Sequence, residues 1–151
     1  HSCGVKVLMK FRRILIIAGI VLAVIGVLLV AVGTFAVART NPPVTTTIEW
    51  DSPETEALVR RACFDCHSNE TVWPWYTYVA PMAFLVANHV EEGRDHLNFS
   101  TDTRFEARDM RQEIERGNMP LPQYLPLHPE AQLTDAEKQQ LIAGLQATFG
   151  G

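Results

Sequence analysis

Cys63, Cys66 and His67 stand in the pattern C-x-x-C-H, within the stretch "RACFDCHSNE". Two thiols three positions apart on a helical turn can reach the two vinyl groups of one porphyrin, and the next imidazole can then bind its iron. A thioredoxin-like dithiol would stand beside a βαβ pattern, and structural zinc would need a second ligand pair. The sequence has neither, so the motif predicts one covalently bound c-type haem with His67 as the proximal iron ligand.

The second axial ligand must come from elsewhere in the chain, and Met119 is the first candidate. It stands in "GNMPLPQY", after a glycine that stops a helix and before a proline. A proline-rich loop restricts the backbone, so a thioether can be held against iron with little ordering cost. The alternatives are His89, on the apolar face of a predicted helix, and then His96, His128 or an open site.

Four aromatic residues follow the motif directly: Trp73, Trp75, Tyr76 and Tyr78. A haem is a large flat hydrophobe that needs aromatic and aliphatic walls to exclude water. We therefore expect these side chains to contact the haem, although ordinary core packing would use the same residues. Asp65, at a variable position of the motif, is expected to face solvent.

The elements that position these residues are predicted to be helices joined by long loops. Ser52 is a good N-cap for a helix that carries forward to the C-x-x-C-H motif, and Thr134 with Glu137 forms a capping box. Gly117 marks a helix end. Apolar periodicity and these signals predict helices over 52–67, 81–97, 104–116 and 134–148, with a proline-rich, ordered but non-helical loop over 118–133.

Residues 14–38 form an uncharged apolar run of 25 positions. At ~1.5 Å per residue this run exceeds a ~30 Å hydrocarbon core, so it predicts one transmembrane helix. Four basic residues and no acid precede it, which places residues 1–13 in the cytoplasm and the rest outside. The predicted organisation is a tail (1–13), a membrane helix (14–38), an extended linker (39–51) and an all-α domain (52–151).

The predicted outer part of the chain is acidic. Five of the 13 basic residues precede residue 40 and all 17 acidic residues follow it, which leaves 8 basic residues and a charge of about −9. Nucleic acid is a poor partner for such a surface. The acidic charge would suit a basic docking partner, or it would serve only to keep the surface hydrated. Small residues at Gly19, Ala23, Gly26 and Gly33 would allow close packing against another membrane helix, or would reflect ordinary membrane-helix composition.

The sequence resembles a known family. The stretches "CFDCHSNETVWPWYTYVAPMAFLVANHVEEGRDHLNFS" and "GNMPLPQYLPLHPEAQLTDAEKQQLIAGL" are similar to the bacterial haem-binding domain family of membrane-anchored mono-haem c-type cytochromes, related to class I cytochrome c. The resemblance covers roughly residues 50–148. It implies Cys63 and Cys66 as haem-attachment residues, His67 and Met119 as iron ligands, and Tyr124 of the MP-Y element as a haem-contact residue.

These observations predict an electron-transfer protein rather than an enzyme. A single-pass protein of the cytoplasmic membrane would carry single electrons on its periplasmic or extracytoplasmic face, as a subunit of, or donor to, a larger respiratory or photosynthetic complex. The alternatives are a peroxidase-like enzyme or a haem-based sensor, each with a labile sixth iron ligand. A redox partner or other membrane subunits are expected, and nucleic acid is not.

Overall fold

The computed structural model describes residues 2–150, with side chains from residue 7 onward, and it confirms the all-helical prediction: no strand occurs among these residues. The elements, with η for a 3-10 turn, are α1 (Ser2–Phe35), α2 (Pro53–Ala62), α3 (Phe64–His67), η1 (Trp75–Tyr78), α4 (Met82–His96), α5 (Ala107–Glu115), η2 (Leu125–Leu127), η3 (Pro129–Ala131) and α6 (Asp135–Phe149).

The chain folds into two compact units. The first unit comprises the chain up to Arg39 together with Trp73–Ala87. The second unit comprises Thr40–Val72 and the chain from Asn88 onward. Helix α4 contributes to both, because the boundary falls after Ala87. The sequence predicted the second unit's helices but not the grouping of residues 73–87 with the N-terminal helix.

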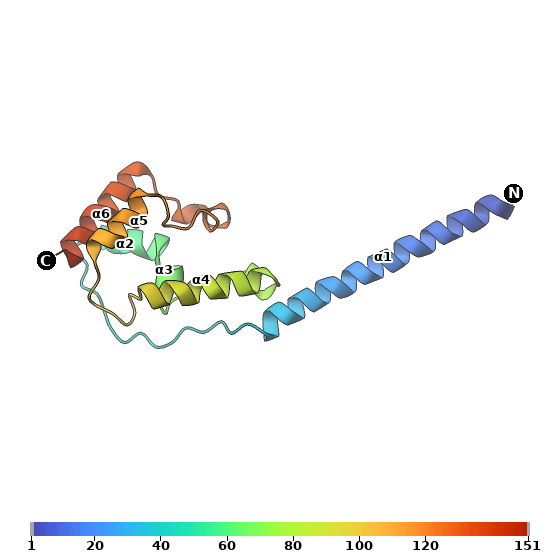
Figure 1. Ribbon diagram of the computed structural model, residues 1–151, viewed down its shortest axis with the longest axis horizontal. Coiled ribbons are helices and arrows are strands. Elements are labelled where there is room, and N and C mark those ends of the chain that lie inside the picture. The colour runs from blue at the N-terminus through green and yellow to red at the C-terminus, as the bar shows by residue number, and fades with distance from the viewer. Residues whose placement is uncertain (1, 151) are drawn as a thin grey trace. The chain divides into compact units, whose positions relative to one another are not determined.

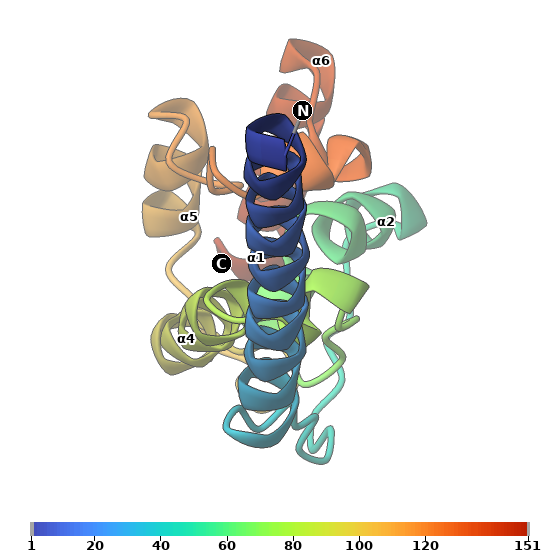
Figure 2. The ribbon, with the colours of Figure 1, turned by 90° about the vertical axis from the view of Figure 1, so that its right-hand side faces the viewer.

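Helix α1 is one continuous helix in both views (Figures 1 and 2). Its stretch Val7–Phe35 is long and apolar enough to cross a membrane. The helix begins twelve residues before the predicted membrane span of 14–38 and ends three residues before its end. The early start has a simple reason, since Ser2–Arg13 contains no proline and is rich in residues that favour a helix.

Helix α2 has the predicted start. Ser52 accepts a hydrogen bond from the Thr55 amide through its hydroxyl, and Pro53 occupies the first turn. The sequence predicted one unbroken helix as far as His67. The structure differs, because the backbone departs from helical geometry at Cys63 (φ −125°, ψ −35°). The separate turn α3 then carries the rest of the motif.

The other predicted helices are confirmed with shifted ends. Gly117, at φ +72°, follows α5 in the left-handed conformation that glycine adopts without strain. Thr134 and Glu137 form both bonds of the predicted capping box at the start of α6. The prediction of a wholly non-helical loop over 118–133 is wrong, because the 3-10 turns η2 and η3 lie within it. Two of its four prolines, Pro126 and Pro129, stand at the start of these turns, where a missing N–H costs little.

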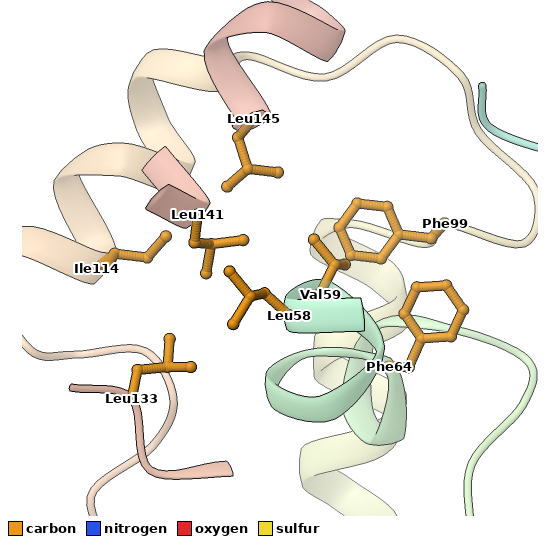
Figure 3. Close-up of a cluster of buried hydrophobic side chains, with 8 residues drawn as sticks. All are labelled: Leu58, Val59, Phe64, Phe99, Ile114, Leu133, Leu141 and Leu145. Carbon is orange, nitrogen blue, oxygen red and sulfur yellow. The ribbon is translucent and has the colours of Figure 1, made fainter. Parts of the chain in front are cut away.

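The core of the second unit joins α2 and α3 to α5 and α6. In Figure 3, Leu58 and Val59 of α2 lie near Leu141 and Leu145 of α6, whereas Phe64 points toward Phe99. The other buried members of the cluster are Ile114 and Leu133. Burial of this kind is the main favourable term in folding, so the cluster fixes α3 against the C-terminal helices.

Candidate functional site

The C-x-x-C-H motif forms a compact helical turn. The amides of Cys66 and His67 both donate to the Cys63 carbonyl oxygen, at 3.2 and 2.9 Å. Neither cysteine is in a disulfide. The turn is held from one side by Phe64, which is buried in the core cluster.

Both thiols lie in surroundings that keep them neutral. Burial, with a smaller contribution from the Cys66 charge, raises the pKa of Cys63 to about 12. Burial, followed by the charge of Asp65, raises the pKa of Cys66 to about 11. Redox dithiols and zinc sites depend on an accessible thiolate, which this environment disfavours. No group of three or more His, Cys, Asp or Glu side chains suited to a metal ion occurs within the described part of the chain.

His67 is oriented by the C-terminal end of α4. Its Nδ1 atom lies 2.9 Å from the Gly93 carbonyl oxygen and 3.1 Å from that of Leu97. Carbonyl oxygens only accept, so Nδ1 carries the proton and donates, which leaves the Nε2 lone pair free. Burial lowers the pKa of His67 and thereby favours the neutral ring. A neutral imidazole with Nδ1–H bonded to a carbonyl is the usual state of a metal-binding histidine.

Gly93 allows this contact. A Cβ atom at this position would lie 2.5 Å from the Cys66 carbonyl oxygen and 3.1 Å from the Cys66 Cβ. Any larger residue would therefore push α4 away from the turn that carries the C-x-x-C-H motif. The glycine is required for close approach of two backbones, and the sequence alone did not reveal this.

Arg94 ties the chain after the motif to the linker before it. Its guanidinium donates to the carbonyl oxygens of Ser68 (2.7 Å) and Thr40 (3.0 Å), and to the side chains of Asn41 (3.0 Å) and Thr71 (2.8 Å). The Arg94 side chain is half-buried, and four hydrogen bonds satisfy its planar fork.

A second polar network lies around Asn69. Its amide donates to the Ser100 hydroxyl (2.9 Å), and its side chain binds the Pro43 carbonyl oxygen and the Asn98 amide group. Between Asn98 and Ser100, Phe99 stacks on Phe64 with ring centroids 5.6 Å apart. The linker is thus hydrogen-bonded to the helical unit rather than a free spacer.

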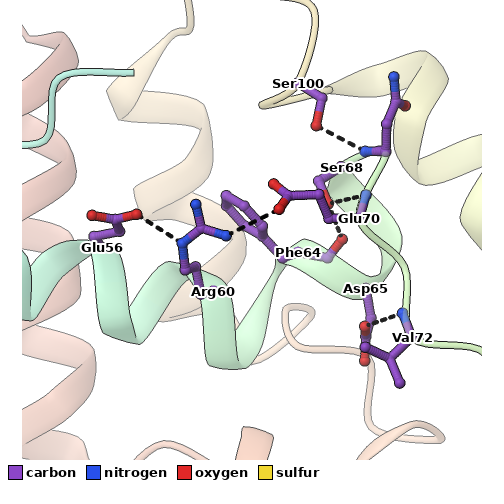
Figure 4. A network of polar contacts seen from close by, with 9 residues as sticks. Glu56, Arg60, Phe64, Asp65, Ser68, Glu70, Val72 and Ser100 are labelled. Carbon is purple, nitrogen blue, oxygen red and sulfur yellow. Dashed lines mark hydrogen bonds and ion pairs between the residues drawn. The ribbon is translucent and has the colours of Figure 1, made fainter. Parts of the chain in front are cut away.

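Charged side chains cover the outer side of the turn. Arg60 binds Glu56 at 2.7 Å and Glu70 at 3.5 Å, and its guanidinium lies 4.4 Å from the centre of the Phe64 ring (Figure 4). The side chains are substantially exposed, so the ion pairs contribute little to stability. The arginine stem and guanidinium nevertheless cover one face of Phe64.

Asp65 corrects one prediction. It was expected to face solvent, yet its Oδ1 accepts from the Val72 amide (3.0 Å) and its Oδ2 accepts from the Tyr124 hydroxyl (2.7 Å). Tyr124 also stacks on His128, with ring centroids 3.8 Å apart. The carboxylate between the two cysteines therefore holds the proline-rich loop against the turn that carries the motif.

Met119 stands at the start of that loop, where the end of α5 fixes its backbone. The Glu113 carbonyl oxygen accepts from the amides of Asn118 (3.0 Å) and Met119 (3.2 Å), and the Met119 side chain is partly exposed. Among the alternatives, His89 is half-buried and His96 is exposed. His128 is buried and its Nδ1 lies 2.9 Å from Glu130 Oε1. The choice of distal ligand stays a prediction.

The predicted aromatic wall and the motif belong to different units. Trp73, Trp75, Tyr76 and Tyr78 all belong to the first unit, whereas the motif and Tyr124 belong to the second. Trp75 is largely exposed, and the Trp73 Nε1 is buried without a hydrogen-bond partner in the described structure. Their predicted contact with a haem stays untested. Gly93, Arg94 and Asp65 were not predicted as functional residues, although all three lie within a stretch that carries the family resemblance.

The fold and the site define a class of protein. It is an all-helical protein with two neutral thiols and one neutral, oriented imidazole on a single turn, a donor set that fits an iron porphyrin. The family model of the haem-binding domain matches residues 27–147, most of the chain, and the protein belongs to that family. No curated protein and no solved structure matches the chain.

Proposed function

We propose that this protein is a membrane-anchored mono-haem c-type cytochrome that carries single electrons on the extracytoplasmic face of the membrane. Cys63 and Cys66 would hold the haem through thioether bonds, and His67 and Met119 would bind its iron. When bound, the haem supplies a one-electron ferric–ferrous couple. The observation that carries the proposal is the double hydrogen bond from His67 Nδ1 to the carbonyl oxygens of Gly93, in α4, and Leu97, just after it, which leaves Nε2 free for iron.

The chain's own residues do three things for such a site. Gly93 and Leu97 fix the tautomer and the ring of His67. The core cluster excludes water from one side of the attachment turn, which favours the neutral thiols that thioether formation consumes. Asp65 and Tyr124 hold the loop that begins with Met119. A fixed loop lowers the ordering cost of a second ligand, which supports a six-coordinate electron carrier over a site with a labile sixth position.

The membrane part of the proposal rests on α1. An apolar helix of this length is consistent with a single-pass anchor. Four basic residues precede its apolar run, whereas Arg39 alone stands between its end and Arg60, and this asymmetry favours a cytoplasmic N-terminus and an outer second unit. A redox partner, or other subunits of a respiratory or photosynthetic complex, would then meet the protein at the membrane.

The test compares the reduction potential and visible spectrum of the full-length protein with those of Met119→Ala and His89→Ala. We expect Met119→Ala to keep the covalent haem, lose the thioether–iron charge-transfer band and have a lower potential, because a thioether favours the ferrous state. His89→Ala should change neither. An unchanged Met119→Ala protein would move the assignment to His89. A high-spin ferric wild type would favour the peroxidase-like or sensor alternative and contradict the electron carrier.

A further inference from the structure

We propose that the segment Trp73–Ala87 lies in the interfacial layer of the membrane that α1 enters, with the boundary between lipid headgroups and acyl chains as its partner. The inference rests on the membrane anchoring in the proposed function. It concerns the first unit only, in which this segment packs against the end of α1. Neither the sequence motif nor the family match assigns the segment a lipid contact.

Backbone contact joins the segment to α1. The Ala80 amide donates to the Leu29 carbonyl oxygen at 3.1 Å. A Cβ atom on Gly33 would lie 2.5 Å from the Tyr78 carbonyl oxygen and 2.7 Å from the Ala80 nitrogen. Only glycine permits this approach, so the segment lies directly against the last turns of the helix.

Arg39 closes the same contact from the other side. Its guanidinium donates to the carbonyl oxygens of Gly33 (2.9 Å) and Thr34 (2.8 Å), which belong to the last turn of α1, and to that of Thr77 (2.8 Å). The guanidinium also lies 4.1 Å from the centre of the Tyr78 ring. A cation that caps the end of a membrane helix belongs at the level of the phosphates.

The depth of the contact follows from the length of the helix. About 20 helical residues cross a ~30 Å hydrocarbon core. A span that begins at Ile14, after the last basic residue of the tail, therefore ends near Gly33. Leu29 lies four residues earlier, roughly 6 Å below that end at ~1.5 Å per residue. Interfacial segments insert to a depth of about 5–10 Å, so Ala80 lies at an interfacial depth.

The composition and exposure of the segment match this environment. No residue of Trp73–Ala87 is charged. Its exposed large side chains, with the fraction of each that is accessible, are Trp75 (78%), Phe84 (47%), Leu85 (45%) and Tyr78 (41%). Tryptophan and tyrosine are enriched at membrane–water interfaces because one end of each ring is apolar and the other polar. An exposed apolar patch of this kind in water would be an aggregation liability.

We assign lipid rather than protein as the partner because the patch is continuous with α1. The described part of α1 exposes large apolar side chains over most of its length, and the segment is bound to its last turns. A lipid surface that surrounds the helix therefore also meets the segment. A second copy of the chain on the same patch is an alternative outcome of the test.

The test is photolabelling of the full-length haem-loaded protein in phosphatidylcholine–phosphatidylglycerol nanodiscs. The probe is a phospholipid with a diazirine on the acyl chain near its carbonyl group, and adducts are mapped by mass spectrometry. The variant Trp75→Glu with Leu85→Glu places two carboxylates on the patch. The matched control is Leu127→Glu, at an exposed leucine of the second unit.

We expect lipid adducts on residues 75–85 of the wild type, comparable in yield with those on the end of α1 and several-fold above those on α5 and α6. The double variant should lose most adducts on 75–85 and keep those on α1, and Leu127→Glu should match the wild type. Adducts on α1 alone, which is the result expected if a second copy of the chain covers the patch, would overturn the inference and leave the anchor intact. Adducts on neither region would contradict the membrane anchor itself.

Discussion

In the first unit Gly33 and Arg39 join the segment Trp73–Ala87 to the end of α1. In the second unit Gly93 and Arg94 join α4 and the linker to the turn that carries the C-x-x-C-H motif. Each glycine lets two backbones meet, and each arginine binds several oxygen atoms at once. Both units therefore use a glycine and an arginine in the same way, but the apolar side chains around each pair differ in burial. Those of the second unit are buried in one cluster, whereas Trp75 and its neighbours in the first unit are exposed.

The difference teaches how to interpret aromatic residues near a haem motif. Phe64 and Phe99 stack within the core that supports the motif. Trp75 is close in sequence but exposed, which suits a lipid surface better than a water-excluding wall. Position along the chain therefore does not decide which aromatic residues serve the cofactor, because the chain leaves the second unit after Val72.

The largest effect is expected from the core of the second unit. Leu141 is 1% exposed, so Leu141→Ala should lower the free energy of unfolding by about 2–5 kcal/mol through lost burial and a residual cavity. The matched change Leu85→Ala in the first unit should cost about 0.5 kcal/mol or less. Denaturant unfolding followed by circular dichroism measures both. Equal losses would erase the contrast between a buried core and an exposed surface.

The two glycines give the next test. Gly93→Ala should cost about 3 kcal/mol, because its Cβ meets backbone atoms of Cys66 that cannot rotate away. It should also shift the reduction potential, since His67 loses its carbonyl partners. In Gly33→Ala the new Cβ also meets rigid backbone atoms, those of Tyr78 and Ala80, but the haem spectrum and reduction potential should stay unchanged. Gly26→Ala, with no atom within 4 Å, is the control for helix propensity. A normal Gly93→Ala potential would contradict the role given to α4.

The two arginines separate the units in the same way. Arg94→Lys should lower the stability of the second unit by about 2 kcal/mol, because an ammonium cannot replace the planar fork that binds four partners. Arg39→Lys should leave that stability unchanged and reduce lipid photolabelling of residues 75–85. Thermal unfolding and photolabelling of both variants make the comparison. An Arg94→Lys protein with wild-type stability would show that the network is dispensable.

A smaller effect is expected at the loop. Tyr124→Phe removes one hydrogen bond to Asp65 and should cost about 1 kcal/mol. If the loop holds the distal ligand, the thioether–iron band of Tyr124→Phe should also bleach at a lower temperature than global unfolding. Tyr78→Phe in the first unit is the control. If the thioether–iron band of Tyr124→Phe persisted up to the temperature of global unfolding, Tyr124 would not be needed to hold the loop that carries the distal ligand.

The smallest effect is a pH dependence at the start of α6. The Thr134 amide, and then Arg61, lower the pKa of Glu137 from 4.5 to about 2. A carboxyl group whose pKa is lower in the folded state stabilises the protein when the pH is above the ordinary pKa of 4.5. This contribution is lost as the pH falls through the folded-state pKa of about 2. The stability gap between wild type and Glu137→Gln should therefore shrink from pH 6 to pH 2. A gap that does not change with pH would contradict the assignment.

Local signals in the sequence predicted much of the fold. The helix caps were predicted correctly at Ser52, Gly117 and Thr134, because a cap depends only on neighbours within about four residues. Gly93 and Arg94 could not be interpreted this way, since their partners lie more than 20 residues away in the chain. Asp65 was misjudged for the same reason, because Tyr124 is 59 residues distant. The motif itself was readable because Cys63, Cys66 and His67 share one turn.

Extraction of the purified full-length protein with acidified acetone tests the central claim most directly, because it removes haem that is not covalently bound. We predict that the Soret absorbance stays with the polypeptide, that the tryptic peptide with Cys63 and Cys66 gains the mass of one haem, and that Cys63→Ala with Cys66→Ala loses both signals. A wild-type polypeptide without Soret absorbance after extraction would contradict the account.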